Sequence, residues 1–234
     1  MINILTSFFN KNKYGNHNKE NLEKRNLEYN NTLIFNLQKE YIEKIYLFIE
    51  DEYSLSILDD LLEKNNLYKD KVVKILFNKQ PMYSDFFLYS NNHLKDKLVM
   101  ITNSDIYLDS YDNHLIQKYI LNKNNVFSLT RHEWDNTKRL IDKYMGSHDS
   151  FIFKSPVNKN IIDKSTFYQN IPGSENLIIY LFHINKYTLF NPCFQFKIVH
   201  LHASQVRNYK GKRINNQQYM HGYIEKKIKP CHLK

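Results

Sequence analysis

The sequence predicts an α/β protein with one mixed, mostly parallel central sheet that is flanked by helices. Two patterns and the chain length predict this fold class. Short apolar segments alternate with segments of helical spacing along the first half of the chain. Each apolar segment is nearly continuous, as in strands that are buried on both faces. The chain has 234 residues, 42% of them hydrophobic, which suits one domain with a sizeable core.

The first half of the chain is expected to alternate strand and helix. The apolar segments that predict strands are residues 2–8, 45–49, 71–77 and 97–102. Helical spacing predicts helices at residues 22–37, at residues 55–62 and from Pro81 onwards, because proline is favoured at the first position of a helix. This half of the chain is therefore expected to be Rossmann-like.

Polar residues gather where three of the predicted strands end. In open α/β sheets, ligands bind beyond the carboxyl ends of the strands, so these clusters are expected to face one crevice. The clusters are Thr6-Ser7, Glu50-Asp51 and Asn103-Ser104-Asp105.

The second half of the chain is less regular. Strands are predicted at residues 126–129, 150–154, 187–190 and 196–201, and a helix at residues 175–185 after the Pro172-Gly173 breaker. Residues 131–147 are polar and contain the only tryptophan, and we expect them to form a mobile loop over the crevice. The basic residues after Tyr209 predict a tail or strap.

Charge and cysteine content exclude several classes of protein. The formal net charge is +9, but lysine far outnumbers arginine, which argues against nucleic acid as the main ligand and favours small phosphate-bearing molecules. The two cysteines, Cys193 and Cys231, form no CxxC pair, so a disulfide scaffold or structural zinc site is not expected. No signal peptide and no apolar run of about 20 residues is evident, which predicts a cytoplasmic protein without a transmembrane segment.

Asp105 is the first candidate for chemistry. It follows an apolar strand, so the sheet would fix its carboxylate at the crevice. A divalent cation that bridges a diphosphate needs only one or two hard oxygen ligands from protein. The alternative is structural: Asn103 and Asp109 would make turn hydrogen bonds, and Asp105 would cap the next helix.

His200 and His202 form a second candidate. Two residues apart on a predicted strand, both imidazoles would lie on one face, where they can bind a metal ion together with a third ligand. Alternatively, one histidine packs in the sheet and the other is exposed.

Two carboxylates are candidates for proton transfer. Glu175 lies near the start of the predicted helix, where it either interacts with the helix dipole or acts on an acceptor hydroxyl. Asp149, just before a strand, supplies another carboxylate. A Ser/His/Asp hydrolase triad is disfavoured, because the sequence contains no G-x-S-x-G turn.

In their order along the chain, these motifs resemble those of glycosyltransferases of the GT-A fold, and most closely small glycosyltransferase-like proteins of bacteria and large DNA viruses. The resemblance spans residues 1–209. The matching stretches are residues 103–109 (Asn103-Ser104-Asp105 and the next four), Thr130-Arg131-His132-Glu133, residues 148–154, Pro172-Gly173-Ser174-Glu175-Asn176, Asn191-Pro192, His200-Leu201-His202-Ala203-Ser204 and Arg207-Asn208-Tyr209.

The resemblance implies a nucleotide-sugar donor, UDP-linked or similar, and a Mn²⁺ or Mg²⁺ ion. Asp105 matches the metal-binding acid of the family's D-x-D-type motif, whose first acid is replaced by Asn103. The family's late histidine matches His200 or His202, and we favour His200. The other expected donor-binding residues are Thr6, Asp51, Asn103, Ser104, Arg131 and Lys154, of which Arg131 or Lys154 adds positive charge.

The resemblance also assigns an acceptor side. The family's acid pair near the acceptor falls on Glu175 and Asn176, and Glu133 and Trp134 are the expected acceptor-binding residues. Asn176 cannot accept a proton as a carboxylate does, so Asp149 or Glu175 takes that role, or the reaction retains the anomeric configuration.

The sequence therefore predicts a single GT-A domain over residues 1–209, with a nucleotide-binding half at residues 1–109, an acceptor half at residues 110–209 and a basic tail at residues 210–234. The expected activity is transfer of a hexose from a nucleoside-diphosphate sugar to a carbohydrate hydroxyl, in the cytoplasm of a cell or, for a viral protein, in the host cytoplasm or virion. The alternatives are an inactive relative that binds a nucleotide or glycan, and a basic nucleic-acid-binding protein.

Overall fold

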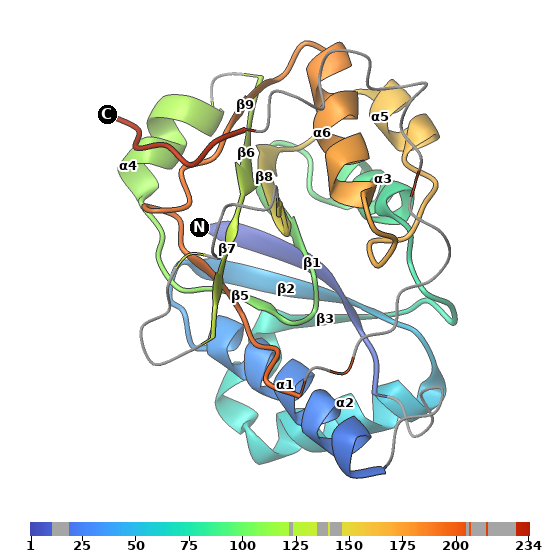
Figure 1. Ribbon diagram of the computed structural model, residues 1–234. Coiled ribbons are helices and arrows are strands. Elements are labelled where there is room, and N and C mark those ends of the chain that lie inside the picture. The colour runs from blue at the N-terminus through green and yellow to red at the C-terminus, as the bar shows by residue number, and fades with distance from the viewer. Residues whose placement is uncertain are drawn as a thin grey trace.

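A seven-stranded sheet forms the centre of the computed structural model, and a three-stranded sheet lies beside it (Figure 1). The structure describes residues 1–10, 19–121, 124–134, 140, 147–204, 206, 214 and 228–234. No helix in this part of the chain is long and apolar enough to cross a membrane.

The large sheet has the strand order β3-β2-β1-β4-β8-β6-β9. Strands β3, β2, β1 and β4 are parallel, β8 is antiparallel to both β4 and β6, and β9 is parallel to β6, which confirms the predicted mixed, mostly parallel sheet. The strands are β1 (Ile2–Phe8), β2 (Ile42–Ile49), β3 (Val72–Leu76), β4 (Leu98–Thr102), β6 (Asn125–Leu129), β8 (Ser150–Lys154) and β9 (Thr188–Phe190).

Helices cover both faces of this sheet. Helices α1 (Lys19–Leu37) and α2 (Glu52–Lys64) lie on one face, and α3 (Tyr83–His93), α5 (Lys159–Lys164) and α6 (Ser174–Ile184) lie on the other (Figure 1). The remaining helical segments are η1 (Asn66–Lys71), α4 (Asn113–Ile116) and η2 (Gln117–Leu121).

Alternation along the strands divides the core in two. In β1, the side chains of Ile2 and Ile4 pack with α1 and α2, whereas that of Leu5 packs with α3 and α6. All seven residues of β1 are buried, because this strand has a neighbour on each side and helices above and below. The near-continuous apolar segments of the sequence reflect this two-sided burial.

The three-stranded sheet was not predicted as a unit. It consists of β5 (Ile106–Leu108), β10 (Ile198–His200) and β7 (Arg131–Glu133), with β10 in the middle. The expectation of a loop over residues 131–147 is wrong at its start, where residues 131–133 pair with β10. Only the middle residue of this short polar strand is buried, so the sequence carries no apolar signal for it. Residues 135–139 and 141–146 of the expected loop lie outside the described residues.

The end of the chain lies against the body of the protein. The N–H of Cys231 donates to the carbonyl of Asn191 at 2.9 Å, and Leu233 exchanges hydrogen bonds of 2.7 and 3.1 Å with the side chain of Gln195. Residues 228–234 are therefore docked, whereas residues 210–213 and 215–227 of the expected basic tail lie outside the described residues.

Candidate functional site

Asp105, His200 and His202 come together at the junction of the two sheets. Asp105 lies between β4 and β5, and His200 ends β10, which pairs with β5 so that His200 is opposite Ile106. The Nε2 atom of His200 lies 3.1 Å from Oδ2 of Asp105, and Nδ1 of His202 lies 3.7 Å from the same oxygen. One ligand atom from each of the three residues lies within 4.8 Å of the others. The structure thus joins two motifs that are 95 residues apart in the sequence.

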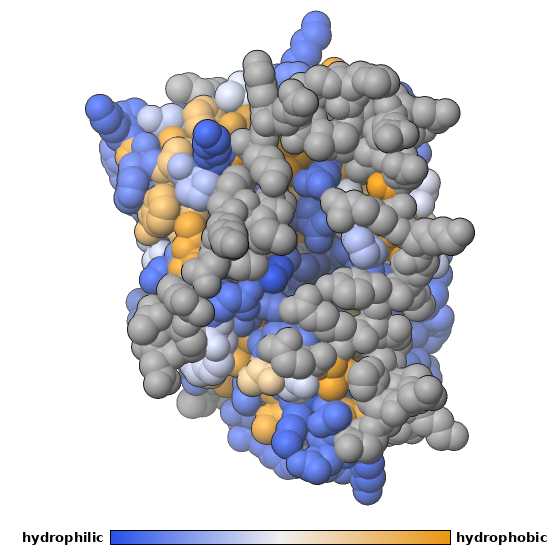
Figure 2. Space-filling model, in the orientation of Figure 1, coloured by the Kyte–Doolittle hydropathy of each residue, from blue (hydrophilic) through white to orange (hydrophobic). Residues whose placement is uncertain are grey.

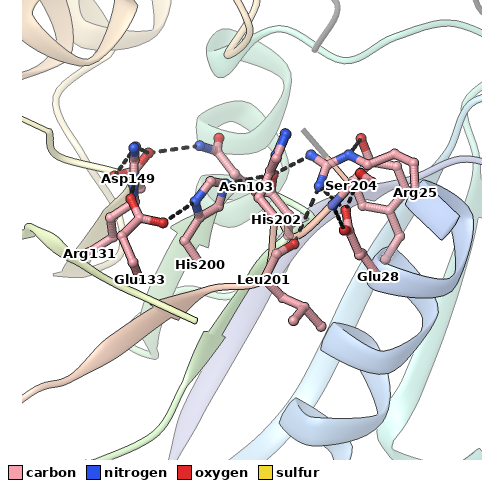
Figure 3. A network of polar contacts seen from close by, with 12 residues as sticks. Arg25, Glu28, Asn103, Arg131, Glu133, Asp149, His200, Leu201, His202 and Ser204 are labelled. Atoms are coloured by element: carbon pink, nitrogen blue, oxygen red, sulfur yellow. Dashed lines mark hydrogen bonds and ion pairs between the residues drawn. The ribbon is translucent and has the colours of Figure 1, made fainter. Parts of the chain in front are cut away.

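The two histidines are held in different ways. His200 lies on β10, as predicted, but β10 ends at this residue, so His202 lies in the following segment and not on the strand. Figure 3 shows both imidazoles in the middle of the polar network, between Arg131 and Glu133 on one side and Arg25 and Glu28 on the other.

Burial and charge set the protonation of the cluster. Burial raises the pKa of Asp105, but His200, His202 and Arg25 outweigh it and hold this pKa well below its usual value. Burial lowers the pKa of His200, yet the adjacent Asp105 and Glu133 carboxylates raise it to about 9. The pKa of His202 is lowered, mainly by burial. In the metal-free protein, protonated His200 therefore forms an ion pair with Asp105 through Nε2.

A second carboxylate, that of Glu133, contacts the ring nitrogen of His200 that does not face Asp105. Glu133 Oε2 lies 3.0 Å from Nδ1 of His200, and Nε of Arg131 donates to Glu133 Oε1 at 2.7 Å. Burial raises the pKa of Glu133, but hydrogen bonds from His200 and Arg131 lower it to about 2. Glu133 is thus ionised and orients the imidazole so that its other nitrogen faces Asp105.

Arg131 also reaches Asp149, which precedes β8. Its Nη1 lies 3.3 Å from Oδ1 of Asp149, and the amide of Asn103 donates to that oxygen at 3.4 Å. Strand β8 begins opposite the end of β4, because Ser150 pairs with Thr102. This antiparallel pairing brings Asp149 to the carboxyl end of the parallel strands.

These groups surround a pocket of about 190 Å³. Hydrophilic residues gather around a recess near the middle of the face shown in Figure 2. Glu175 reaches the pocket from the first turn of α6, which follows Gly173, a residue with a φ of 89° that glycine adopts readily. The lining residues are Ser7, Phe9, Arg25, Tyr29, Glu50, Gln80, Asn103, Ser104, Asp105, Arg131, Asp149, Gln169, Asn170, Ile171, Pro172, Glu175, His200, His202 and Val206.

Several sequence-predicted donor residues lie elsewhere. Lys154 pairs with Leu98 at the opposite end of β4 and forms an ion pair with Asp96 at 3.4 Å, because β8 runs antiparallel. Thr6 lines a smaller neighbouring cavity. Asp51 caps α2 by accepting a hydrogen bond of 2.7 Å from the N–H of Ser54. None of these three lines the pocket described above.

The predicted acceptor residues are also separated by the fold. Glu133 points to His200, whereas the ring of Trp134 stacks on Phe35 of α1 with ring centroids 5.8 Å apart. Neither lines the pocket, and nor does Asn176, although its neighbour Glu175 does.

Sequence reasoning missed the contribution of α1. Arg25 is buried and donates to Asp105, to Glu28 at 2.7 Å and to the hydroxyl of Tyr29 at 2.9 Å. Arg25 and Tyr29 fall on the same helical stripe as the buried Leu22 and Leu33, so a charged residue at an otherwise apolar position was the available signal.

The donor atoms of Asp105, His200 and His202 fit a divalent metal ion. A carboxylate with two imidazoles suits a first-row transition ion better than Mg²⁺, which prefers oxygen ligands throughout. Three protein ligands leave about half of an octahedral shell for phosphate oxygens and water. These residues open onto the pocket, so a ligand bound there can complete the shell.

Neither a protein-family model nor a curated protein sequence matches this chain. Solved structures do resemble it in fold. A mannosyltransferase from Pyrobaculum calidifontis in complex with GDP-Man and Mn²⁺ aligns with a TM-score of 0.54 at 8% sequence identity, over 86% of this chain and 56% of the mannosyltransferase. This chain therefore spans only 56% of that protein's length.

A candidate glucose-1-phosphate thymidylyltransferase from Bacillus anthracis aligns with a TM-score of 0.50 at 12% identity, over 81% of this chain and 85% of that protein. At such identities the likeness concerns the fold. The mixed α/β chain with its seven-stranded, mostly parallel sheet has the GT-A, nucleotidyltransferase-like fold.

Proposed function

We propose that the protein is a metal-dependent glycosyltransferase that moves a sugar from a nucleoside-diphosphate sugar to a hydroxyl of a carbohydrate acceptor. The observation that carries this proposal is the cluster of Asp105, His200 and His202, which opens onto a polar pocket at the carboxyl ends of β1 and β4. The GT-A fold, which it has in common with a mannosyltransferase, supports the same choice.

Sugar transfer requires that charge on the leaving diphosphate is neutralised and that the acceptor hydroxyl loses its proton. The bond between the anomeric carbon and the diphosphate oxygen breaks while a bond to the acceptor oxygen forms, so negative charge develops on the diphosphate. A divalent cation held by Asp105 and the two histidines, with Mn²⁺ preferred over Mg²⁺, supplies charge neutralisation when bound. Arg25 and Arg131 also line the pocket and add positive charge that is fixed before substrate arrives.

The acceptor hydroxyl must lose its proton as it attacks. Glu175 is the proposed general base, because it lines the same pocket as the candidate metal ligands and comes from the first turn of α6. Asp149 is bound by Arg131 and Asn103, which suits it to orienting the donor sugar. If Glu175 is not the base, Asp149 is the alternative. Asn176 lies outside the pocket, so its lack of a carboxylate does not weaken this proposal.

Donor screening tests the proposal. The protein is incubated with UDP-, GDP-, dTDP- and CMP-linked sugars in MnCl₂, and release of the free nucleotide is followed by chromatography. We expect release from one donor class, inhibition by EDTA, and a loss of at least about 100-fold in Asp105→Asn. If no donor binds or is hydrolysed, and Asp105→Asn behaves as the wild type does, the proposal fails.

Nucleotidyl transfer is the second candidate, because the candidate thymidylyltransferase shares this fold over most of its own length. The products distinguish the two: pyrophosphate from a nucleoside triphosphate and a sugar phosphate, against a nucleoside diphosphate from a nucleotide sugar. An inactive relative, suggested by the asparagines at positions 103 and 176, would bind a nucleoside diphosphate with metal but release nothing.

A further inference from the structure

We propose that Arg25 and Glu28 of α1 form a clamp that positions the three candidate metal ligands. The inference rests on the proposed function, since these ligands have a task only if a cation binds them. It concerns residues that lie on a helix and belong to none of the recognisable motifs, and that act through Asp105, His200 and His202.

Arg25 connects the carboxylate ligand to the segment that carries both imidazoles. Its Nη2 lies 2.5 Å from Oδ2 of Asp105, and its Nη1 donates to the carbonyl of Leu201 at 3.3 Å. Leu201 lies between the two histidines, and its own N–H donates to the carbonyl of Asp105 at 2.8 Å. One guanidinium therefore fixes the distance between the acid and the histidine segment.

Glu28 holds the same segment on the other side of His202. One of its carboxylate oxygens accepts from the N–H of Ser204 at 2.5 Å and the other from the Ser204 hydroxyl at 3.0 Å. That second oxygen also accepts from Nη1 of Arg25 at 2.7 Å. The backbone on both sides of His202 is thus bound to α1, at Leu201 by Arg25 and at Ser204 by Glu28 (Figure 3).

His202 needs these contacts because it lies beyond the last residue that pairs in the small sheet. Strand β10 ends at His200, so strand pairing orients the first imidazole but not the second. Arg25 and Glu28 are both buried, with side chains 9% exposed, so their charges act on each other and on Asp105 with little screening by water. A buried arginine with two carboxylate partners costs far less than an isolated one.

Two possible roles of Arg25, positioning the metal ligands or competing with the metal ion for Asp105, predict opposite effects on metal affinity. If Arg25 positions the ligands, its loss lowers metal affinity, as loss of outer partners does at known metal sites. If Arg25 instead occupies Asp105 in place of a metal ion, its loss raises metal affinity. The contacts of Arg25 with Tyr29 and Leu201, besides those with Asp105 and Glu28, favour positioning, because they hold the guanidinium in place.

Calorimetric titration of the metal-free protein with MnCl₂ tests the proposal without any nucleotide sugar. We expect Arg25→Met and Glu28→Gln to weaken the Kd for Mn²⁺ by about 10- to 100-fold at unchanged stoichiometry. Lys24→Met is the matched control: it removes the same charge one residue away on α1, from an exposed side chain that pairs with Glu20, and should leave the Kd unchanged. Partial unfolding would instead lower the stoichiometry and leave the Kd of the folded fraction as it was.

A second variant keeps the test decisive if Arg25→Met does not fold. Ser204→Ala removes the hydroxyl contact to Glu28 and a long hydrogen bond of 3.5 Å from the N–H of Val206, but keeps the backbone contact to Glu28. It should weaken the Kd for Mn²⁺ by about threefold to tenfold, a loss typical of one hydrogen bond. Wild-type affinity in Glu28→Gln and Ser204→Ala, or tighter binding in Arg25→Met, overturns the clamp and leaves the proposed function standing. Failure of the wild type to bind Mn²⁺ at all overturns the metal-dependent function, and the clamp with it.

Discussion

The two sheets meet at Asp105, and different forces hold the large sheet and the β7 edge of the small sheet. The large sheet is stabilised by apolar burial: β1, β4 and β6 are buried along their whole length, and rows of apolar side chains pack on both faces. The small sheet has three short strands, and its β7 edge is fixed by ion pairs of Arg131 and Glu133 that reach His200 and Asp149. Loss of an apolar contact should therefore mainly affect the fold, and loss of a charge should mainly affect the site.

The largest effect is expected in the large sheet. Phe48 of β2 is buried against Phe77, Phe86 and Tyr89, so Phe48→Ala leaves a cavity and should lower the free energy of unfolding by about 3 to 5 kcal/mol. Urea unfolding measures this loss. The Kd for Mn²⁺ of the folded variant should stay within about twofold of the wild type; a larger change would mean that the two sheets are not independent.

The next largest effect is expected at the junction. Asp105→Asn leaves the buried Arg25 without one carboxylate partner and should destabilise residues 198–204 by about 3 kcal/mol. Hydrogen exchange detects this as faster exchange of the amide of Leu201, while the amides of β1 keep their protection. Uniformly faster exchange in both sheets would show that the contacts of Asp105 also stabilise the large sheet, which would contradict the expected independence of fold and site.

A smaller effect follows from pH in the large sheet. His148 is buried just before β8, with its Nδ1 3.0 Å from the hydroxyl of Ser128 in β6, and burial lowers its pKa from 6.5 to about 4. Between these two values the unfolded chain takes up a proton that the folded protein does not. The free energy of unfolding should therefore fall by about 1.4 kcal/mol per pH unit as the pH drops through this range.

Urea unfolding at several pH values from 7 to 4 tests this slope. His148→Gln should remove the share of His148 and leave that of His132, whose pKa burial also lowers to about 4. His200 adds nothing there, because with a pKa of about 9 it is protonated in both states below about pH 6. An unchanged slope in the variant would assign the acid sensitivity to other groups.

The smallest effect is expected at Glu133 of β7, in the small sheet. Glu133→Gln keeps a hydrogen-bond acceptor for Nδ1 of His200 but removes the charge, so the Kd for Mn²⁺ should weaken by about tenfold. The melting temperature in EDTA should change little, since the side chain is about one third exposed. If metal affinity does not change, Glu133 has no part in orienting His200.

The sequence predicts the large sheet well because its signal is apolar burial. Nearly every strand of that sheet was expected at its place, and the polar residues at the ends of β1 and β4 were expected at one crevice. Asp105 and His200 could be named from motifs, although their contact depends on the pairing of β5 with β10, and strands of three residues are too short to give a periodic signal.

Two kinds of error have physical causes. Lys154 was assigned to the crevice, but a single sequence does not reveal that β8 runs antiparallel, so that Asp149 before its start and not Lys154 at its end lines the pocket. Arg25 was overlooked because α1 is rich in charged residues, although Arg25 falls on the stripe of the buried Leu22 and the exposed Lys24 beside it does not.

The reversed direction of β8 has a consequence for how such a protein can diversify. The connection that leaves β7 at Glu133 and returns to β8 through Asp149 begins and ends beside the same opening. Its length can therefore change over generations without shifting the register of any strand. Insertions between these two ends leave the strand pairings underneath intact.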